Sequence, residues 1–250
     1  MTSRIAIAPS ILTRYLAEGA ANLTVDAGDF AVIESGRIGA YPNHAIHPEA
    51  GISVRDLGVI ALQSAVRPDE LDAPMVWVRT SGPTGELVAR ATVASYFGFR
   101  PRAWVDQPDE DAEVVICDEA AAVAPLEIGH RTDLARAWFV LTGLPLVTHV
   151  LAVPPDATAE IVEAVAAWFT GMGGLDKEER RSAREAIATE TGASPSAIAA
   201  LMDGVRWQMG VDERRSIAEL FARAGVANQV GPIRWHRNER EPDANAPGSS

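Results

Sequence analysis

A small set of hydroxyl, carboxyl and imidazole side chains stands within or just beyond apolar stretches that are typical of strands. They are Glu34, Ser35, Thr80, Ser81, Thr84, Asp118 and His149. In an α/β protein, residues that follow strands gather at one edge of a sheet, where ligands bind. Hydroxyl groups and helix N-terminal amides hold anions, whereas carboxyl and imidazole groups transfer protons. The set therefore indicates a site for a small anionic molecule.

The turn Thr80-Ser81-Gly82-Pro83-Thr84-Gly85 is the most structured loop pattern in the chain. It follows an expected strand, Met75–Val78, and precedes an expected helix, Glu86–Phe97. A strand, a turn of small residues and a helix together offer backbone N–H groups to an anion. The alternative is a capped helix entered by a tight turn, for which Ser and Thr are also typical.

The other candidates each have two interpretations. Glu34 and Ser35 close a short buried strand, and Glu34 is either a base at the site or an exposed strand-end carboxylate. His149 lies in an apolar strand, where it serves as an acid or base or is a histidine satisfied within the strand. Asp118 precedes Glu119 at another strand end and is also placed to cap the next helix. No cluster of histidines accompanies this acidic pair at ligand spacing, so we expect no metal.

The pattern of elements indicates an α/β fold with late helices. From residue 55 to 153 the order is strand, strand, helix, strand, helix, strand. Four helices with apolar residues at i, i+3 and i+4 follow; they are expected at Thr158–Phe169, Lys177–Thr189, Ser196–Met209 and Glu213–Ala224. The stretch from Gly36 to Gly51 predicts an irregular loop, and residues 236–250 predict a disordered tail.

Composition excludes several classes of protein. The chain has 250 residues, a net charge of −12 and a pI near 4.9, which argues against nucleic acid and an anionic membrane as partners. Its single cysteine, Cys117, rules out a disulfide framework within the chain. No apolar run reaches the ~20 residues of a membrane span, and residues 1–9 do not resemble a secretory signal. We expect a soluble cytoplasmic protein, and the pattern leaves its oligomeric state open.

Several short sequence motifs match those of one known family in residue type and in their order along the chain. The longest runs from Asp133 to Val147 and contains Trp138 and Thr142-Gly143-Leu144-Pro145. The other blocks are Pro9–Gly19, Asp29–Ser35, Asp69–Asp72, Thr80–Thr84 and Val115–Ala120. Together they resemble the chorismate dehydratase branch of the futalosine route to menaquinone. A sister branch, which makes 1,4-dihydroxy-6-naphthoate, carries a histidine at the position of Asp118, so this aspartate favours the dehydratase.

The resemblance implies a two-lobed fold like that of periplasmic binding proteins (type II), with a cleft between the lobes. It places lobe one at residues 1–64 and 148–235 and lobe two at residues 65–147, with the C-terminal helices on lobe one. The implied reaction is dehydration of chorismate to 3-[(1-carboxyvinyl)oxy]benzoate, which needs no metal or organic cofactor. Site residues are then assigned as catalytic (Glu34, Ser35 and His149) or as substrate-binding (Thr80, Ser81, Thr84 and Asp118).

Two departures from the family pattern keep other functions open. The family opens with ~30 residues that include a Tyr-Leu-Asn turn, for which this chain shows no counterpart. Val59 stands where the family has an active-site serine, and valine cannot form the hydrogen bonds of a hydroxyl. The alternatives are a catalytically degenerate member that binds a small carboxylate without turnover and, less favoured by the N-terminal sequence, a transport solute-binding protein.

Overall fold

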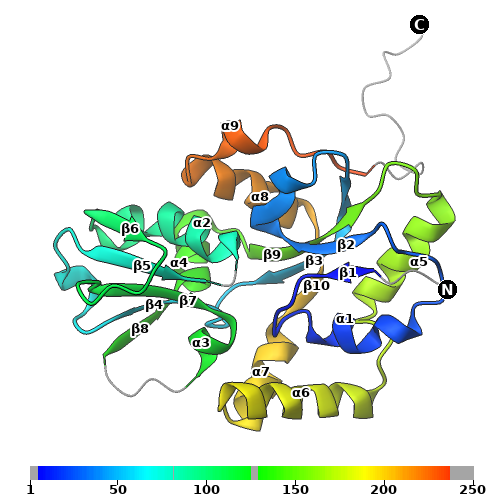
Figure 1. The fold of residues 1–250 in the computed structure, drawn as a ribbon, viewed down its shortest axis with the longest axis horizontal. Coiled ribbons are helices and arrows are strands. Elements are labelled where there is room, and N and C mark those ends of the chain that lie inside the picture. Colours follow the sequence, from blue (N-terminus) through cyan, green and yellow to red (C-terminus); the bar gives the residue numbers. More distant parts are fainter. Residues whose placement is uncertain (1–4, 81, 125–128, 237–250) are drawn as a thin grey trace, which may run out of the picture.

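Two five-stranded sheets, one in each lobe, organise the chain in the computed structural model (Figure 1). The structure describes residues 5–80, 82–124 and 129–236. Its strands are β1 (Ala6–Ile7), β2 (Ala31–Glu34), β3 (Ala45–Val54), β4 (Ile60–Ser64), β5 (Met75–Arg79), β6 (Ala103–Val105), β7 (Val114–Asp118), β8 (His130–Asp133), β9 (Leu146–Val153) and β10 (Arg206–Gln208). Its α-helices are α1 (Arg14–Glu18), α2 (Pro83–Thr92), α3 (Glu119–Val123), α4 (Leu134–Thr142), α5 (Ala159–Thr170), α6 (Lys177–Thr191), α7 (Pro195–Gly204), α8 (Val211–Arg223) and α9 (Ala227–Val230). Short turns of other helix types are η1 (Gly19–Asn22), η2 (Ser35–Ala40), η3 (Pro68–Glu70) and η4 (Val93–Phe97).

The first lobe is built on the sheet β1-β2-β9-β3-β10. Strand β9 lies at its centre, antiparallel to β2 and β3, and every one of its residues is buried. The prediction of an irregular loop from Gly36 to Gly51 is wrong, because β3 begins at Ala45 inside it. Pro48 and a register shift between Ile46 and Gly51 interrupt this strand, which hides its alternation in the sequence.

The second lobe is built on the sheet β6-β5-β7-β4-β8. Strand β5 is parallel to β6 and β7, whereas β4 is antiparallel to β7 and β8. Strand β4 therefore belongs to this sheet, although the expected boundary after residue 64 places it in lobe one. The chain enters lobe two before β4 and returns to lobe one with β9, so the structure places the first boundary near residue 58.

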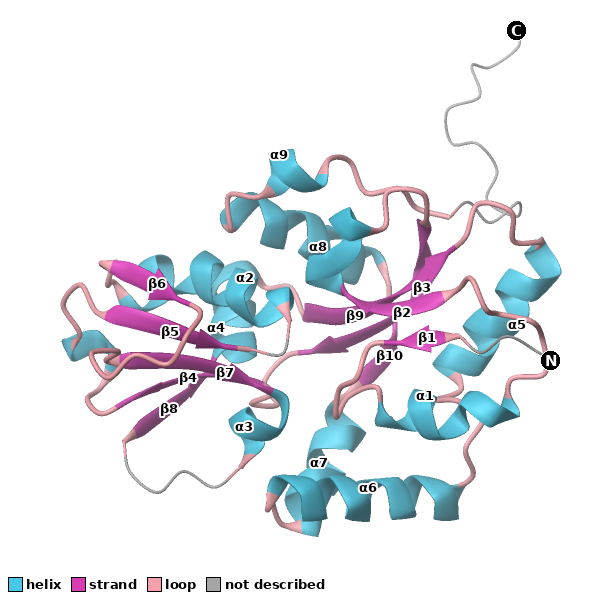
Figure 2. Cartoon of the chain, viewed as in Figure 1, coloured by secondary structure: helices cyan, strands magenta, loops and turns pink. Residues whose placement is uncertain are grey.

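Helices flank the first sheet, and α8 lies between it and the second lobe (Figure 2). Helix α5 packs on β3, and α8 packs on β9 and on α2 of the second lobe. The predicted third late helix ends early, at Gly204, because the chain then forms the edge strand β10. Residues 234–236 run beside the start of β3, with the Ile46 amide donating to the Arg234 carbonyl (2.7 Å). The remainder of the predicted tail, residues 237–250, lies outside the described residues.

The longest family-like block forms the connection from α4 to β9. Asp133 caps α4 by accepting hydrogen bonds from the amides of Ala135 (2.8 Å) and Arg136 (3.3 Å). Gly143 ends the helix in the left-handed conformation, with φ 71°. Trp138 is fully buried, and its Nε1–H donates to Ser216 of α8. This block thus fastens lobe two to lobe one and belongs to the scaffold rather than to a reacting centre.

Within the residues that the structure describes, no helix is both long and apolar enough to cross a membrane.

Candidate functional site

Four polar segments meet where the two lobes touch. They are Ser10-Ile11 before α1, Glu34-Ser35 after β2, the turn into α2 around Thr84, and Asp118-Glu119 after β7. The first two segments come from lobe one and the last two from lobe two. We call this region the junction.

One half of the junction surrounds the N-terminus of α2. The Thr84 hydroxyl accepts a hydrogen bond from the Gly36 amide (3.1 Å) and lies 3.5 Å from the Ser35 hydroxyl. The Ser35 hydroxyl donates to the Val147 carbonyl (2.7 Å), and Ser35 is fully buried. Its proton is therefore committed to the backbone, so Ser35 holds the lobes in register rather than presenting a nucleophile.

The Glu34 carboxylate lies at the N-terminus of α2 and accepts a hydrogen bond from the Thr84 amide (3.3 Å). Glycines make this approach possible, since a β-carbon at residue 82 would overlap the carboxylate. A β-carbon at residue 36 would come within 2.9 Å of the Thr84 nitrogen. The helix amide that was expected to receive a ligand carboxylate thus receives one from the protein itself.

Thr80 and Asp118 flank the same helix turn. A β-carbon added at Gly85 would touch the Thr80 methyl group and would lie 3.6 Å from Oδ2 of Asp118. Asp118 occupies the N-cap position of α3, with extended backbone angles. The structure therefore brings Glu34 of lobe one close to Thr80, Thr84 and Asp118 of lobe two. Ser81 lies outside the described residues.

The other half of the junction is centred on Glu119. Its carboxylate accepts one hydrogen bond from the Ser10 hydroxyl and one from the Ile11 amide, each 2.8 Å long. Its own amide donates to the Val59 carbonyl (2.9 Å), and its φ of 54° is unusual for a residue with a side chain. Burial raises the pKa of Glu119 to about 7, against the opposing effect of the Ser10 and Ile11 hydrogen bonds.

Glu119 is the functional candidate that the sequence did not single out. An acidic group that titrates near neutral pH can both accept and return a proton. Strain at a non-glycine residue with positive φ is also common at functional sites. Neither the left-handed backbone nor the contact with Ser10, which lies 109 residues away, has a local sequence signal. Ser10 lies before α1, which begins at Arg14.

His149 lies beside the junction but inside the sheet. It pairs in register with Glu34 across β2 and β9, and only 2% of its surface is exposed. Nδ1 lies 3.1 Å from the Thr148 hydroxyl, whereas Nε2 has no hydrogen-bond partner among the described residues. Burial lowers the pKa of His149 to about 3, so the ring is neutral at pH 7. A positively charged histidine acid is therefore excluded at that pH.

The junction is acidic, since Glu34, Asp118 and Glu119 lie in it. Among the residues that the structure describes, no group of three or more His, Cys, Asp or Glu side chains is arranged to hold a metal ion. Val59 is buried in the core, and its carbonyl accepts the hydrogen bond of the Glu119 amide. The arrangement provides hydrogen-bond donors for two carboxylates and an acid–base group between the lobes.

Two α/β lobes joined by two crossings, with helix N-termini and polar loops at their junction, define a two-lobed α/β fold. Several solved structures have a similar fold. Protein AF1704 from Archaeoglobus fulgidus has a TM-score of 0.64 at 14% identity and covers 91% of this chain and 98% of its own. The periplasmic aliphatic sulphonate-binding protein SsuA from Escherichia coli has a TM-score of 0.59 at 12% identity, with coverages of 99% and 97%.

The family is shown by the sequence itself. A model of the menaquinone biosynthesis family matches residues 29–225, and the chain belongs to this family. The Candida albicans CA3427 gene product, described as having the generic periplasmic binding protein fold, has a TM-score of 0.51 at 10% identity, with coverages of 97% of this chain and 99% of its own. Comparison with curated proteins finds no significant match. The expected fold and family are thereby confirmed.

Proposed function

We propose that the chain is a dehydratase of menaquinone synthesis, which converts chorismate to 3-[(1-carboxyvinyl)oxy]benzoate and water. The observation that carries the proposal is the presence of two donor sets at the junction, each holding a carboxylate. One set is the Thr84 amide, which binds Glu34; the other is the Ser10 hydroxyl with the Ile11 amide, which binds Glu119. Chorismate carries two carboxylates, which would replace these side chains when the substrate enters.

Glu119 is the group that we assign to proton transfer. Released from Ser10 and Ile11, its carboxylate would take the proton from the ring carbon beside the carbon that bears the hydroxyl. The C–O bond to that hydroxyl breaks, and the proton on Glu119 passes to the leaving oxygen as water. The ring becomes aromatic, and neither an oxidant nor a reductant is needed. The pKa of about 7 suits a group that must be ionised first and protonated later.

The remaining site residues are assigned supporting roles. Thr80, Thr84 and Asp118 would position the substrate at α2, and Ser35 would hold the lobes in register through Val147. His149 would act only as a neutral neighbour of Glu34. We expect the reaction in the cytoplasm, which fits the free, buried Cys117.

The test is incubation of the purified protein with chorismate, followed by chromatography with mass detection. We expect protein-dependent loss of one water and no product with Glu119→Gln. The matched control is Glu110→Gln, which changes an exposed carboxylate of the same lobe. Intact chorismate with folded protein, or equal product from Glu119→Gln, would contradict the assignment.

A second candidate function is binding of a small carboxylate without turnover. Two observations favour it: Val59 supplies no hydroxyl, and the protein's own Glu34 occupies the α2 amide. This candidate predicts saturable binding of chorismate in calorimetry and recovery of the ligand unchanged. Detection of the dehydrated product would remove it.

A further inference from the structure

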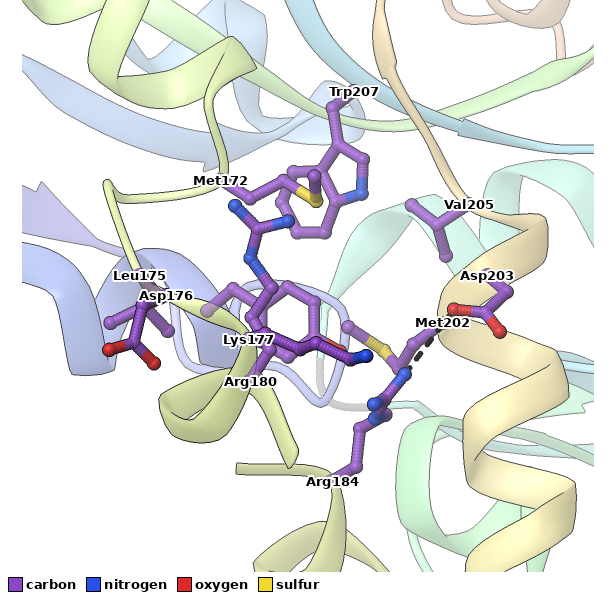
Figure 3. Close-up of a pocket in the computed structure, with 11 residues that line it drawn as sticks. Met172, Leu175, Asp176, Lys177, Arg180, Arg184, Met202, Asp203, Val205 and Trp207 are labelled. Atoms are coloured by element: carbon purple, nitrogen blue, oxygen red, sulfur yellow. Dashed lines mark hydrogen bonds and ion pairs between the residues drawn. The ribbon is translucent and has the colours of Figure 1, made fainter. Parts of the chain in front are cut away.

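A pocket of about 580 Å³ lies wholly within the first lobe, between α1, α6, α7 and β10 (Figure 3). This volume is in the range of small-molecule sites. Its lining combines basic and aromatic side chains, among them Tyr15, Lys177, Arg180, Arg184 and Trp207. None of these residues belongs to the junction.

The basic side chains come from one face of α6. Lys177, Arg180 and Arg184 are spaced i, i+3 and i+7, and such residues share a face of a helix. Arg184 is paired with Asp203 at 3.3 Å, as the dashed line in Figure 3 marks. Lys177 and Arg180 form no ion pair with any described residue, and Nε of Arg180 is buried without a hydrogen-bond partner.

The acidic side chains at this pocket are already engaged. Asp203 pairs with Arg184, and Asp176 caps α6 by accepting from the amides of Glu178 (2.8 Å) and Glu179 (2.9 Å). The lining holds three cations against these two carboxylates, so in a chain with a net charge of −12 the pocket carries a local excess of positive charge. An anionic group placed there would form charge-assisted hydrogen bonds with the cations.

The opposite wall is aromatic. Trp207 is 7% exposed, and its indole N–H has no hydrogen-bond acceptor among the described residues. The rings of Tyr15 and Trp207 are stacked, with centroids 5.8 Å apart. Burial raises the pKa of Tyr15, which keeps its phenol neutral and able to donate a hydrogen bond. Aromatic rings and a neutral phenol therefore line the pocket together with the cations of α6.

We propose that this pocket binds an organic anion with a flat apolar body, of the aryl carboxylate or aryl sulfonate class. Arg180 and Lys177 take the acidic group, and Trp207 contacts the ring. The assignment goes beyond the proposed function, since it concerns a second ligand and uses no residue of the junction.

The first measurement is calorimetric titration with naphthalene-2-sulfonate, with neutral naphthalene-2-sulfonamide as the matched ligand. We expect one saturable site for the sulfonate and affinity weaker by about tenfold or more for the sulfonamide and for Arg180→Gln. The control is Arg181→Gln, which changes an exposed arginine of α6 that pairs with Glu178 and Glu185. Equal affinity for the two ligands, or an equal loss from Arg181→Gln, would overturn the proposal.

The second measurement needs no variant, because Lys177 is the only lysine of the chain. Acetylation of its amine, followed by mass spectrometry of the peptide that contains it, reports on the pocket alone. We expect naphthalene-2-sulfonate to slow this acetylation severalfold, in the wild-type protein and equally in Glu119→Gln. An unchanged rate at saturating sulfonate would overturn the proposal, whatever the outcome with chorismate.

Discussion

The junction and the lobe-one pocket differ in whether their hydrogen-bond donors and cations already have a carboxylate partner. At the junction, the donors of Thr84, Ser10 and Ile11 are already satisfied by carboxylates of the chain. In the pocket, Lys177 and Arg180 have no carboxylate partner among the described residues. A ligand must therefore displace protein groups at the junction, whereas it only adds to the pocket. The same fold can thus hold one site that is closed on itself and another that is open.

The largest expected effect is on turnover at the junction. Glu119→Gln keeps the shape of the side chain but removes the acid–base group, so we expect kcat for chorismate dehydration to fall by about 10²–10⁴-fold. In the wild-type protein kcat/KM should rise as pH increases through about 7, because the base must be ionised in the free enzyme. The measurement is kcat and kcat/KM between pH 5.5 and 9 for both proteins. A Gln variant that keeps the wild-type rate and pH profile would remove Glu119 from the mechanism.

The second effect is on stability and has a definite sign. The folded-state pKa of Glu119 is about 7, above its ordinary value of 4.5, so its contribution is fully present below pH 4.5 and is lost as pH rises through 7. We expect the free energy of unfolding of Glu119→Gln, relative to that of the wild type, to rise by about 2–3 kcal/mol between pH 4.5 and 8. This magnitude follows from about 1.36 kcal/mol per pKa unit, reduced because the carboxylate is partly exposed. Urea unfolding at several pH values measures it.

The comparison with the Gln variant also separates the contribution of Glu119 to the pH dependence of stability from that of the buried histidines. His47 and His149 have pKa values lowered by burial to about 4 and about 3, so their contributions fall as pH drops below about 6.5. Both proteins contain these histidines, and their effects cancel in the difference. A difference that does not change with pH would mean that the Glu119 carboxylate is not held in a buried state.

A third prediction contrasts the two regions directly. Glu34→Ala frees the Thr84 amide at the N-terminus of α2, so we expect the KM for chorismate to fall by about tenfold. Arg180→Gln in the pocket should have the opposite sign, weakening the binding of an anion. Steady-state kinetics separates the roles of Glu34, with Glu110→Gln as the control. A lower kcat with an unchanged KM would instead make Glu34 part of the chemistry.

The sequence predicts the two-lobed fold and about half of the residues at the junction. Strand ends and a turn of small residues are local features, so the sequence itself indicates Glu34, Thr80, Thr84 and Asp118, which lie close together in the structure. The sequence does not indicate Glu119, because the environment of this residue depends on a positive φ and on contact with a segment more than 100 residues away.

The pocket was missed for a different reason. The i, i+3, i+7 spacing of Lys177, Arg180 and Arg184 is typical of a solvated helix face and does not by itself predict a site. Only the tertiary structure places that face opposite Tyr15 and Trp207. Both Glu119 and the pocket depend on long-range packing, which local sequence propensity does not predict.

The smallest expected effect tests whether the scaffold can be weakened without changing either site. Ser216→Ala removes the acceptor of the Trp138 indole N–H, which links α4 of lobe two to α8 of lobe one. Both residues are buried, so the orphaned donor should lower the free energy of unfolding by about 1–2 kcal/mol. We expect unchanged kcat for chorismate and unchanged affinity for naphthalene-2-sulfonate in the folded variant. Trp138→Phe with Ser216→Ala should destabilise by less than the sum of the two single changes, because both remove the same hydrogen bond. A loss of kcat in Ser216→Ala alone would show that this contact also sets the geometry of the junction, and the division between scaffold and site would then fail.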